Sequence, residues 1–291
     1  MSTDLFLQLL LNGLMLAGIY GLLSVGLNLI FGVMRVLNFA HGEIIMIGGY
    51  TAFWLFTLLG LTPLWSLPLA LPAFFLLGMA IQRLLITPLL PRRAQIEDTS
   101  LVMTYGLSLF LASFARFLFS VDYRSVGYMR GSLFVGGMVF SYAQIAAFTV
   151  ALVLTVLLFL FLKATRLGMA IRATAQNREL ASACGIESGT IYMITFGLGA
   201  ATAGAAGSIF SLLFAIYPEM GLEYSLRAFV IVILGGMGNL LGALVGALVL
   251  ALAETFVGFL YNAQLAATIP FVLVILILLL RPGGLTSGSD R

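Results

Sequence analysis

The sequence predicts an all-α polytopic membrane protein of about eight transmembrane helices, some of them discontinuous or re-entrant. Of its 291 residues, 62% are hydrophobic and only 9% are charged. So few charges leave too little polar surface for a soluble globule. Uncharged stretches also recur along the chain, each about as long as the ~20 residues that a membrane-spanning helix needs. Together these observations predict a single transmembrane domain over residues 1–291.

The spans follow from the uncharged stretches in chain order. We expect them at residues 5–33, 44–61, 64–88, 99–121, 134–162, 190–217, 227–254 and 266–280. Within 227–254, Gly238, Gly242 and Gly246 recur every fourth residue, which favours close helix packing, and the pair Gly235 and Gly236 invites a break. This stretch is therefore either one broken helix or a re-entrant hairpin followed by a span.

The loops between the spans predict the topology. Basic side chains gather in the loops 88–98, with Arg92 and Arg93, and 163–188, with Lys163. Cytoplasmic loops carry an excess of Lys and Arg, so both loops should be cytoplasmic. The loops that carry Arg124 and Glu219 should then be external, and so should the N-terminus.

The charged segment 163–188 is either a solvated loop or a docking element for a cytoplasmic partner. Leu167, Ile171 and Ala175 recur every fourth residue, which predicts an apolar stripe on a short helix. Two short helices are costly to hold at a membrane surface unless something packs against them. Docking to a cytoplasmic partner is therefore the more specific of the two interpretations.

A second short helix should follow within this segment. Asn177 is a suitable N-cap residue, Glu179 lies in the first turn where the helix dipole favours an anion, and Gly185 is a natural stop. These signals predict a helix of about two turns after Asn177.

Two Gly- and Asn-containing segments interrupt apolar runs at residues 32–38 and 235–239. Each leaves an asparagine where a new helix can start, and the halves of the chain open with helices of opposite direction. An inverted repeat with discontinuous helices is one way in which transporters build a central site. The alternatives are a chance match and glycines that merely permit packing.

These breaks supply the candidate residues for a solute path. Small residues let the backbone approach a solute, and helix N-termini offer N–H groups to a carboxylate. His41 and Glu43 are either an interfacial pair satisfied by backbone and water or part of a gate, because ionisable groups among spans usually face a cavity or the bundle interior. Arg227 and Glu254 are expected at the interfacial ends of their helix. The candidates are Asn38, His41, Glu43, Gly235, Gly236, Gly238 and Asn239.

Several function classes lack their motifs. The only lysine, Lys163, is not part of a GxxxxGK[ST] phosphate-binding loop, so the chain is not its own P-loop ATPase. The only histidine, His41, has no second metal ligand at helical spacing, and Cys184 is the only cysteine. We therefore expect no enzymatic activity, no metal and no cofactor. The basic residues lie in separate loops, which argues against a nucleic-acid partner.

Four segments, taken together, resemble the LivH-type permease of branched-chain amino acid ABC importers. They are GLNLIFGVMRVLNFAHGEIIMIGGY (26–50), RLGMAIRATAQNRELASACGI (166–186), AFVIVILGGMGNLLGALVGALVLALAE (228–254) and the terminal LLRPGGL. The segment 228–254 carries the glycines of the break at 235–239. The segment 166–186 carries, at residues 179–185, a pattern similar to the EAA-xxx-G coupling signature of ABC import permeases. Leu180 replaces the first Ala of that signature. The coupling residues that this resemblance implies are Arg178, Glu179, Ala181 and Gly185.

The resemblance implies a permease subunit in the inner membrane of a bacterium, surrounded by lipid. Its implied partners are a second, LivM-like permease, two cytoplasmic ATP-binding subunits and a periplasmic solute-binding protein. The implied cargo is a branched-chain or related hydrophobic amino acid. Alternatives are an ABC permease for urea, amides or small carboxylates, and an ion-coupled secondary transporter, for which Glu43 and Glu254 are the candidate acids.

Overall fold

The computed structural model describes residues 3–90, 96–281 and 283–286, and these fold almost entirely into helices. Eight of the helices in the described part are long and apolar enough to cross a membrane, which confirms an all-α polytopic membrane protein. They are α1 (Thr3–Met34), α2 (His41–Leu59), α3 (Pro63–Ile81, continued by π and 3-10 turns to Leu89), α4 (Ile96–Phe119), α5 (Tyr142–Ala164), α8 (Ser188–Phe210), α10 (Leu240–Leu260) and α11 (Ala263–Leu280). The shorter elements are α6 (Arg166–Gln176), α7 (Arg178–Ala183), α9 (Met220–Gly235), β1 (Ser132–Val135) and β2 (Met138–Ser141).

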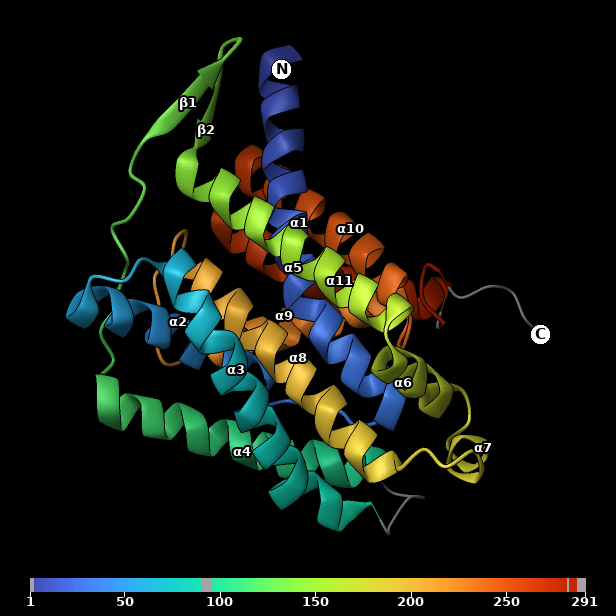
Figure 1. Cartoon of the computed structure of the whole chain (residues 1–291). Coiled ribbons are helices and arrows are strands. Elements are labelled where there is room, and N and C mark those ends of the chain that lie inside the picture. Colours follow the sequence, from blue (N-terminus) through green and yellow to red (C-terminus); the bar gives the residue numbers. More distant parts are fainter. Residues whose placement is uncertain (1–2, 91–95, 282, 287–291) are drawn as a thin grey trace.

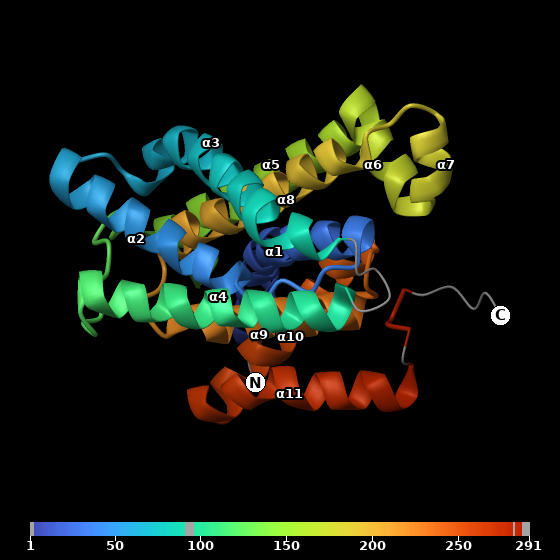
Figure 2. The same cartoon turned by 90° about the horizontal axis from the view of Figure 1, so that it is seen from below.

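Helices α1 and α8 form the centre of the bundle, and α4 and α11 lie at its periphery (Figures 1 and 2). The packing of α8 depends on small residues, because Gly204 lies against the Phe74 ring of α3 and the Ser208 hydroxyl donates to the Gly48 carbonyl oxygen of α2 at 3.2 Å. Such small residues let helices approach closely without the hydrophobic driving force that water provides. The peripheral helices instead show apolar side chains outward, as lipid or another subunit requires.

The two ends of the bundle carry different loops. Figure 2 shows α6, α7, the start of α4 and the end of α11 at one end, and the turn between α2 and α3 at the other. At that other end the two loops predicted to be external meet: Arg124 and Ile216 exchange backbone hydrogen bonds of 2.9 and 2.7 Å, and Arg116 pairs with Glu219 at 3.0 Å. The predicted grouping of Lys163 apart from Arg124 and Glu219 is therefore confirmed. Arg92 and Arg93 lie outside the described residues.

Two predicted spans are too long. Residues 134–141 were expected within the fifth span, but they belong to the β1–β2 hairpin, in which Ser132 pairs with Ser141. From α1, the Gln8 side chain donates to the Val139 carbonyl oxygen at 3.1 Å, and this bond holds the hairpin against the first helix. The sixth span ends at Phe210 and not at residue 217, because Ile216 is paired with the loop that follows α4.

The stretch 227–254 contains a break, as expected, but its first helix begins earlier. Helix α9 has 16 residues and starts at Met220, seven residues before the expected start at residue 227. After a turn at residues 236–239, α10 continues to Leu260. The stretch is therefore not one continuous span: it is divided into a short helix, α9, and a span, α10, which pack against each other.

Candidate functional site

The first break lies between α1 and α2 and is held by hydroxyl groups of other helices. The Thr104 hydroxyl of α4 accepts from the Phe39 N–H at 3.0 Å, and its one proton lies between the carbonyl oxygens of Leu37 at 2.9 Å and Ser100 at 2.8 Å. The Ser225 hydroxyl of α9 donates to the Phe39 carbonyl oxygen at 2.7 Å and accepts from the Gly42 N–H at 2.8 Å. Non-helical backbone inside a membrane survives only where protein or water satisfies its polar groups. Helices α4 and α9 therefore make this break possible.

Asn38, His41 and Glu43 are buried inside the bundle beside this break. The His41 Nε2 lies 2.9 Å from the Leu23 carbonyl oxygen, and Glu43 accepts from the Ser108 hydroxyl at 3.0 Å. Of the two alternatives, this burial does not fit an interfacial pair that water satisfies: α2 begins at His41, and its first turn is packed against α1, α4 and α9.

Asn38 does not cap α2, contrary to the prediction. Ala40 occupies the N-cap position without a side-chain hydrogen bond. The Asn38 side chain is 0% exposed, and neither atom of its amide has a hydrogen-bond partner among the described residues. The backbone groups near Asn38 are satisfied by Thr104 and Ser225, which leaves the amide without a capping role.

The second break, between α9 and α10, is held by two asparagines. Asn239 caps α10 as predicted, since its Oδ1 accepts from the Gly242 N–H at 3.1 Å. From α1, the Asn28 side chain accepts from the Gly238 N–H and donates to the Asn239 carbonyl oxygen, both at 2.6 Å. Gly238 has φ +86°, which a residue with a Cβ rarely adopts. A Cβ on Gly32 would lie 3.0 Å from the Gly238 Cα, so the turn rests directly on α1.

Gly235 and Gly236 pack against backbone. A Cβ on Gly235 would lie 2.2 Å from the Gly242 carbonyl oxygen, and Gly236 adjoins the segment after α11. That segment is bound to the end of α9, because the Leu285 N–H donates to the Leu234 carbonyl oxygen at 2.8 Å. These two glycines therefore permit packing at the back of the break.

Both breaks line one cavity of about 570 Å³, here called the break cavity. Arg35 and Phe39 come from the first break, Met237 and Gly238 from the second, and Phe229 from α9. Its size lies within the range of small-molecule sites, which are mostly apolar with a few polar groups. The structure thus unites Gly238 with the first break. Of the other candidates, Asn38, Gly236 and Asn239 adjoin lining residues in the sequence, whereas His41, Glu43 and Gly235 do not line the cavity.

Arg35 lines the break cavity, although the sequence analysis does not predict it as a site residue. Among the described residues that line the break cavity it is the only ionisable one. Its backbone has φ +56°, in the left-handed region that is uncommon for residues other than glycine. One sequence feature does indicate Arg35: it is a charged residue in the interruption between two apolar runs.

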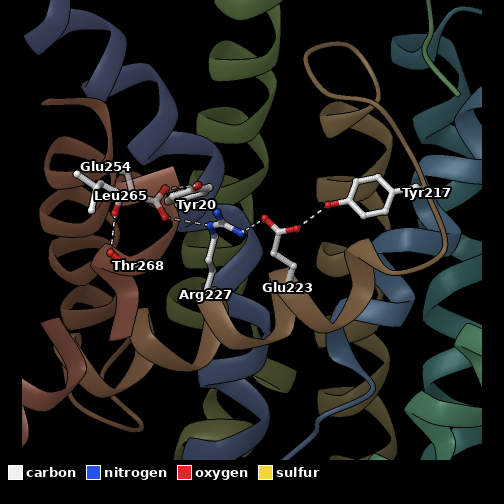
Figure 3. Close-up of polar contacts among 7 residues, drawn as sticks. All are labelled: Tyr20, Tyr217, Glu223, Arg227, Glu254, Leu265 and Thr268. Atoms are coloured by element: carbon white, nitrogen blue, oxygen red, sulfur yellow. Dashed lines mark hydrogen bonds and ion pairs between the residues drawn. The ribbon is translucent and has the colours of Figure 1, made fainter. Parts of the chain in front are cut away.

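A chain of charged and tyrosine side chains joins α1, α9 and α10 (Figure 3); Arg227 and Glu254 in it are largely buried, whereas Glu223 is half-exposed. Arg227 pairs with Glu254 at 3.0 Å and with Glu223 at 2.6 Å, while Tyr20 donates to Glu254 and Tyr217 to Glu223, both at 2.5 Å. Burial raises the pKa of Tyr217, so its hydroxyl keeps the proton that it donates. Arg227 and Glu254 are therefore not interfacial helix ends: charges at this depth are paired, as is usual.

Helix α6 forms as expected but presents a different face. Gly168, Ile171 and Thr174 are buried, whereas Leu167 and Ala175 are exposed. The predicted stripe is thus carried by a helix, but only its member Ile171 belongs to the packed face. The reason is the close approach at Gly168, where a Cβ would lie 2.4 Å from the Leu162 carbonyl oxygen, so that this side of α6 meets the end of α5.

The ends of α7 follow the prediction. The Asn177 Oδ1 accepts from the N–H groups of Glu179 and Leu180, both at 3.0 Å, which confirms it as N-cap. Gly185 has φ +83°, as expected for a residue that stops a helix.

The two faces of α7 differ. Ala181 is buried, and the Arg178 guanidinium lies 5.1 Å from the centre of the Tyr192 ring of α8, so these residues attach α7 to the bundle. On the other face Glu179 is exposed and Leu180 is 66% exposed. An exposed leucine on a rigidly attached helix is suited to contact with another protein.

Comparison with known proteins agrees with this architecture. The family described as branched-chain amino acid transport system, permease component, matches residues 9–279. The high-affinity branched-chain amino acid transport system permease protein BraD of Pseudomonas aeruginosa is 33% identical, over 96% of this chain and 95% of its own. LivH of Escherichia coli (96% and 95%) and a probable LivH of Methanocaldococcus jannaschii (97% and 93%) are each 29% identical. No solved structure matches the chain. With a match over nearly its whole length, the chain belongs to the family of permease components of branched-chain amino acid transport systems.

Proposed function

We propose that this chain is the transmembrane permease subunit of an ABC importer that carries branched-chain amino acids into the cytoplasm of a bacterium. Its partners in the inner membrane would be a second, LivM-like permease, two ATP-binding subunits and a periplasmic solute-binding protein. Residues 1–291 act as one transmembrane domain, with 163–188 as the segment that couples to the ATPases. The names of the relatives support the solute class and the type of transport system.

The break cavity is the observation that carries the proposal. A branched-chain amino acid combines a carboxylate with an apolar side chain, and the cavity combines Arg35 with apolar walls that include Phe39 and Phe229. A guanidinium binds a carboxylate through two parallel hydrogen bonds. The walls supply the apolar surface that a leucine-like side chain requires.

We place the solute path between the two breaks. Gly238 forms one wall, and Asn38 lies behind the other as a buried amide with free hydrogen-bonding capacity. Asn239 fixes the start of α10, while Gly235 and Gly236 let α9, α10 and the C-terminal segment hold this wall in place.

His41 and Glu43 act in this proposal by holding α2. Their bonds to Leu23 and Ser108 set the position of its first turn, which follows the first break directly. The path therefore depends on both side chains without contact to the solute.

The α6–α7 segment is the proposed docking site for an ATP-binding subunit. Arg178 and Ala181 attach α7 to the bundle, Gly185 fixes the turn into α8, and Glu179 and Leu180 face outward. A force applied to the exposed face is thus transmitted to α8, one of the two central helices. This rigid attachment supports a role in coupling.

Reconstitution of the complete importer into liposomes tests the solute and the energy source. We expect leucine uptake that requires ATP and the solute-binding protein, and that valine and isoleucine inhibit but urea, amides and small carboxylates do not. Uptake by this chain alone under a proton or sodium gradient would instead identify an ion-coupled secondary transporter. Inhibition by urea or a small carboxylate would identify a different cargo.

Variants of Arg35 test the cavity. Arg35→Gln should raise the KM for leucine at least about tenfold, because a charge-assisted pair to the carboxylate is lost. Arg35→Lys should recover part of this loss because the positive charge remains. Equal KM values for the glutamine variant and the unaltered importer would remove the carboxylate from this site.

Two glycines with open space around them test the coupling segment. Neither Gly185 nor Gly189 has any atom within 4 Å of an added Cβ, but only Gly185 has a positive φ. Gly185→Ala should therefore distort the turn after α7, at a cost of about 1–2 kcal/mol, and lower the leucine transported per ATP hydrolysed. Gly189→Ala is the matched control. Equal coupling ratios in both variants would contradict the role of this turn.

A further inference from the structure

A second cavity, of about 450 Å³, lies where α1, α5, α6 and α10 meet. Its apolar floor includes Leu29 and Val33 of α1 and Leu162 of α5, and its polar residues include Lys163 and Arg172. We call it the basic cavity. Gly32 and Gly238 line both this cavity and the break cavity, so the contact between these glycines stands between the two spaces.

The two cations of the basic cavity are not neutralised within the chain. Lys163 and Arg172 are both exposed, and neither forms an ion pair with another described residue. The described lining contains no acidic side chain. The first turn of α10 at Leu240 adds the positive end of a helix dipole. This part of the cavity therefore attracts an anion.

The cavity lies at the ends of three membrane-spanning helices, and lipid headgroups are found beside such ends. Lys163 is in the last turn of the span α5, Val33 is in the last turn of α1, and Leu241 is in the first turn of α10. Three spans thus end around it, and α6 lies at this end of the bundle (Figure 2). Phe159 and Leu241 are 37% and 56% exposed, so the apolar wall reaches the outer surface of these spans.

We propose that the basic cavity binds an anionic phospholipid, with an acyl chain against Leu29, Val33 and Leu162 and the phosphate between Lys163 and Arg172. Basic pockets between transmembrane helices on the cytoplasmic side are suited to such headgroups. A free anion would leave the apolar floor unused, and a zwitterionic lipid would bring a cationic group beside its phosphate, which Lys163 and Arg172 repel. Because Lys163 ends α5 and Arg172 belongs to α6, the bound lipid ties the coupling segment to the membrane.

Lipid retention by the purified full chain, with the subunits that it carries, tests this proposal without a transport assay. The protein is exchanged into nanodiscs of equal phosphatidylglycerol and phosphatidylcholine and then released into detergent, and the retained lipids are measured by native mass spectrometry. We expect phosphatidylglycerol to dominate. The Lys163→Gln/Arg172→Gln variant should retain about 30-fold less, the factor expected for two cations near an anionic surface.

Arg166→Gln is the matched control, because Arg166 is an exposed cation of α6 that does not line the basic cavity. It should retain phosphatidylglycerol as the unaltered protein does. Equal retention of the two lipids by the unaltered protein, a measurement that needs no variant to fold, would overturn the proposal. Undiminished retention by the double variant would do the same. Displacement by millimolar inorganic phosphate would show a site for a free anion, and not for a lipid.

Discussion

The two breaks use the same residue type in different ways. Asn239 of the second break caps the helix that follows it, at 3.1 Å from the Gly242 nitrogen to its Oδ1. Asn38 of the first break caps nothing, and its amide has no partner among the described residues. The backbone near Asn38 is satisfied from a distance along the chain, by Thr104 and Ser225.

This difference shows which residues determine the structure of each break. The second break is a short turn that carries its own cap and glycine, and its residues 237–239 are exposed. The first break has Val36, Asn38 and Ala40 buried, and its backbone is satisfied because two helices, more than 60 and more than 180 residues further along the chain, bring hydroxyls to it. A locally encoded break should tolerate the loss of one bond better than a break that depends on tertiary contacts.

The largest effect is expected from Thr104→Val. Valine keeps the shape of threonine but leaves the Phe39 N–H without its acceptor, and it removes the proton that the Leu37 carbonyl oxygen shares with that of Ser100. Each buried polar group left unsatisfied costs about 1–3 kcal/mol. The variant should lower the thermal unfolding midpoint of the purified complex clearly and reduce leucine uptake.

Thr149→Val is the control for this substitution. Thr149 is exposed on α5 and its hydroxyl donates only to the Ile145 carbonyl oxygen of its own helix. It should leave stability and uptake almost unchanged. If Thr104→Val were equally silent, the first break would not depend on α4.

A smaller effect is expected from Asn239→Ala in the second break. Loss of an N-cap side chain costs about 1 kcal/mol. Here water reaches the exposed turn, and Asn28 still holds the backbone of Gly238 and Asn239. The unfolding midpoint should therefore fall less than in Thr104→Val.

Asn262→Ala separates the cap from the cavity. Asn262 caps α11 in the same manner, accepting from the Leu265 N–H at 2.8 Å, and it does not line the break cavity. Both alanine variants should lose similar stability, but only Asn239→Ala should slow leucine uptake. Equal uptake in the two variants would mean that the start of α10 does not shape the path.

The features visible in the sequence are those encoded over a few residues. The apolar spans, the Asn177 cap, the stop at Gly185 and the cap at Asn239 each depend on neighbours within about one helical turn. They were all predicted correctly in kind, although the fifth and sixth spans were drawn too long because the hairpin and the Ile216 bridge are themselves apolar.

The features that the sequence concealed depend on residues far apart in the chain. Arg227 and Glu254 belong to two helices that a turn separates in the chain, and they pair only in the folded structure. From the sequence alone, each charge is therefore assigned to an interfacial helix end. The face of α6 depends on where the end of α5 meets Gly168. The break cavity requires Arg35 and Gly238 to meet across 203 positions, which no local pattern indicates.

The smallest effect on stability is expected from Asn38→Leu, because this substitution removes a polar group that has no partner among the described residues. A buried amide without partners costs free energy in the folded state, so an apolar side chain of similar volume should leave the unfolding midpoint equal or higher. If Asn38 contributes its amide to the solute path, uptake should nevertheless fall. Stability and transport would then change in opposite directions.

Asn28→Leu provides the contrast within the same protein. Asn28 is equally buried, but its amide makes two bonds of 2.6 Å to the second break, so leucine there should lower the unfolding midpoint and uptake together. A fall in stability for Asn38→Leu would show that the amide has a structural partner. Unchanged stability with unchanged uptake would instead remove Asn38 from the path and leave Arg35 and Gly238 as its residues, since a buried amide that serves neither folding nor solute has no remaining role at the break.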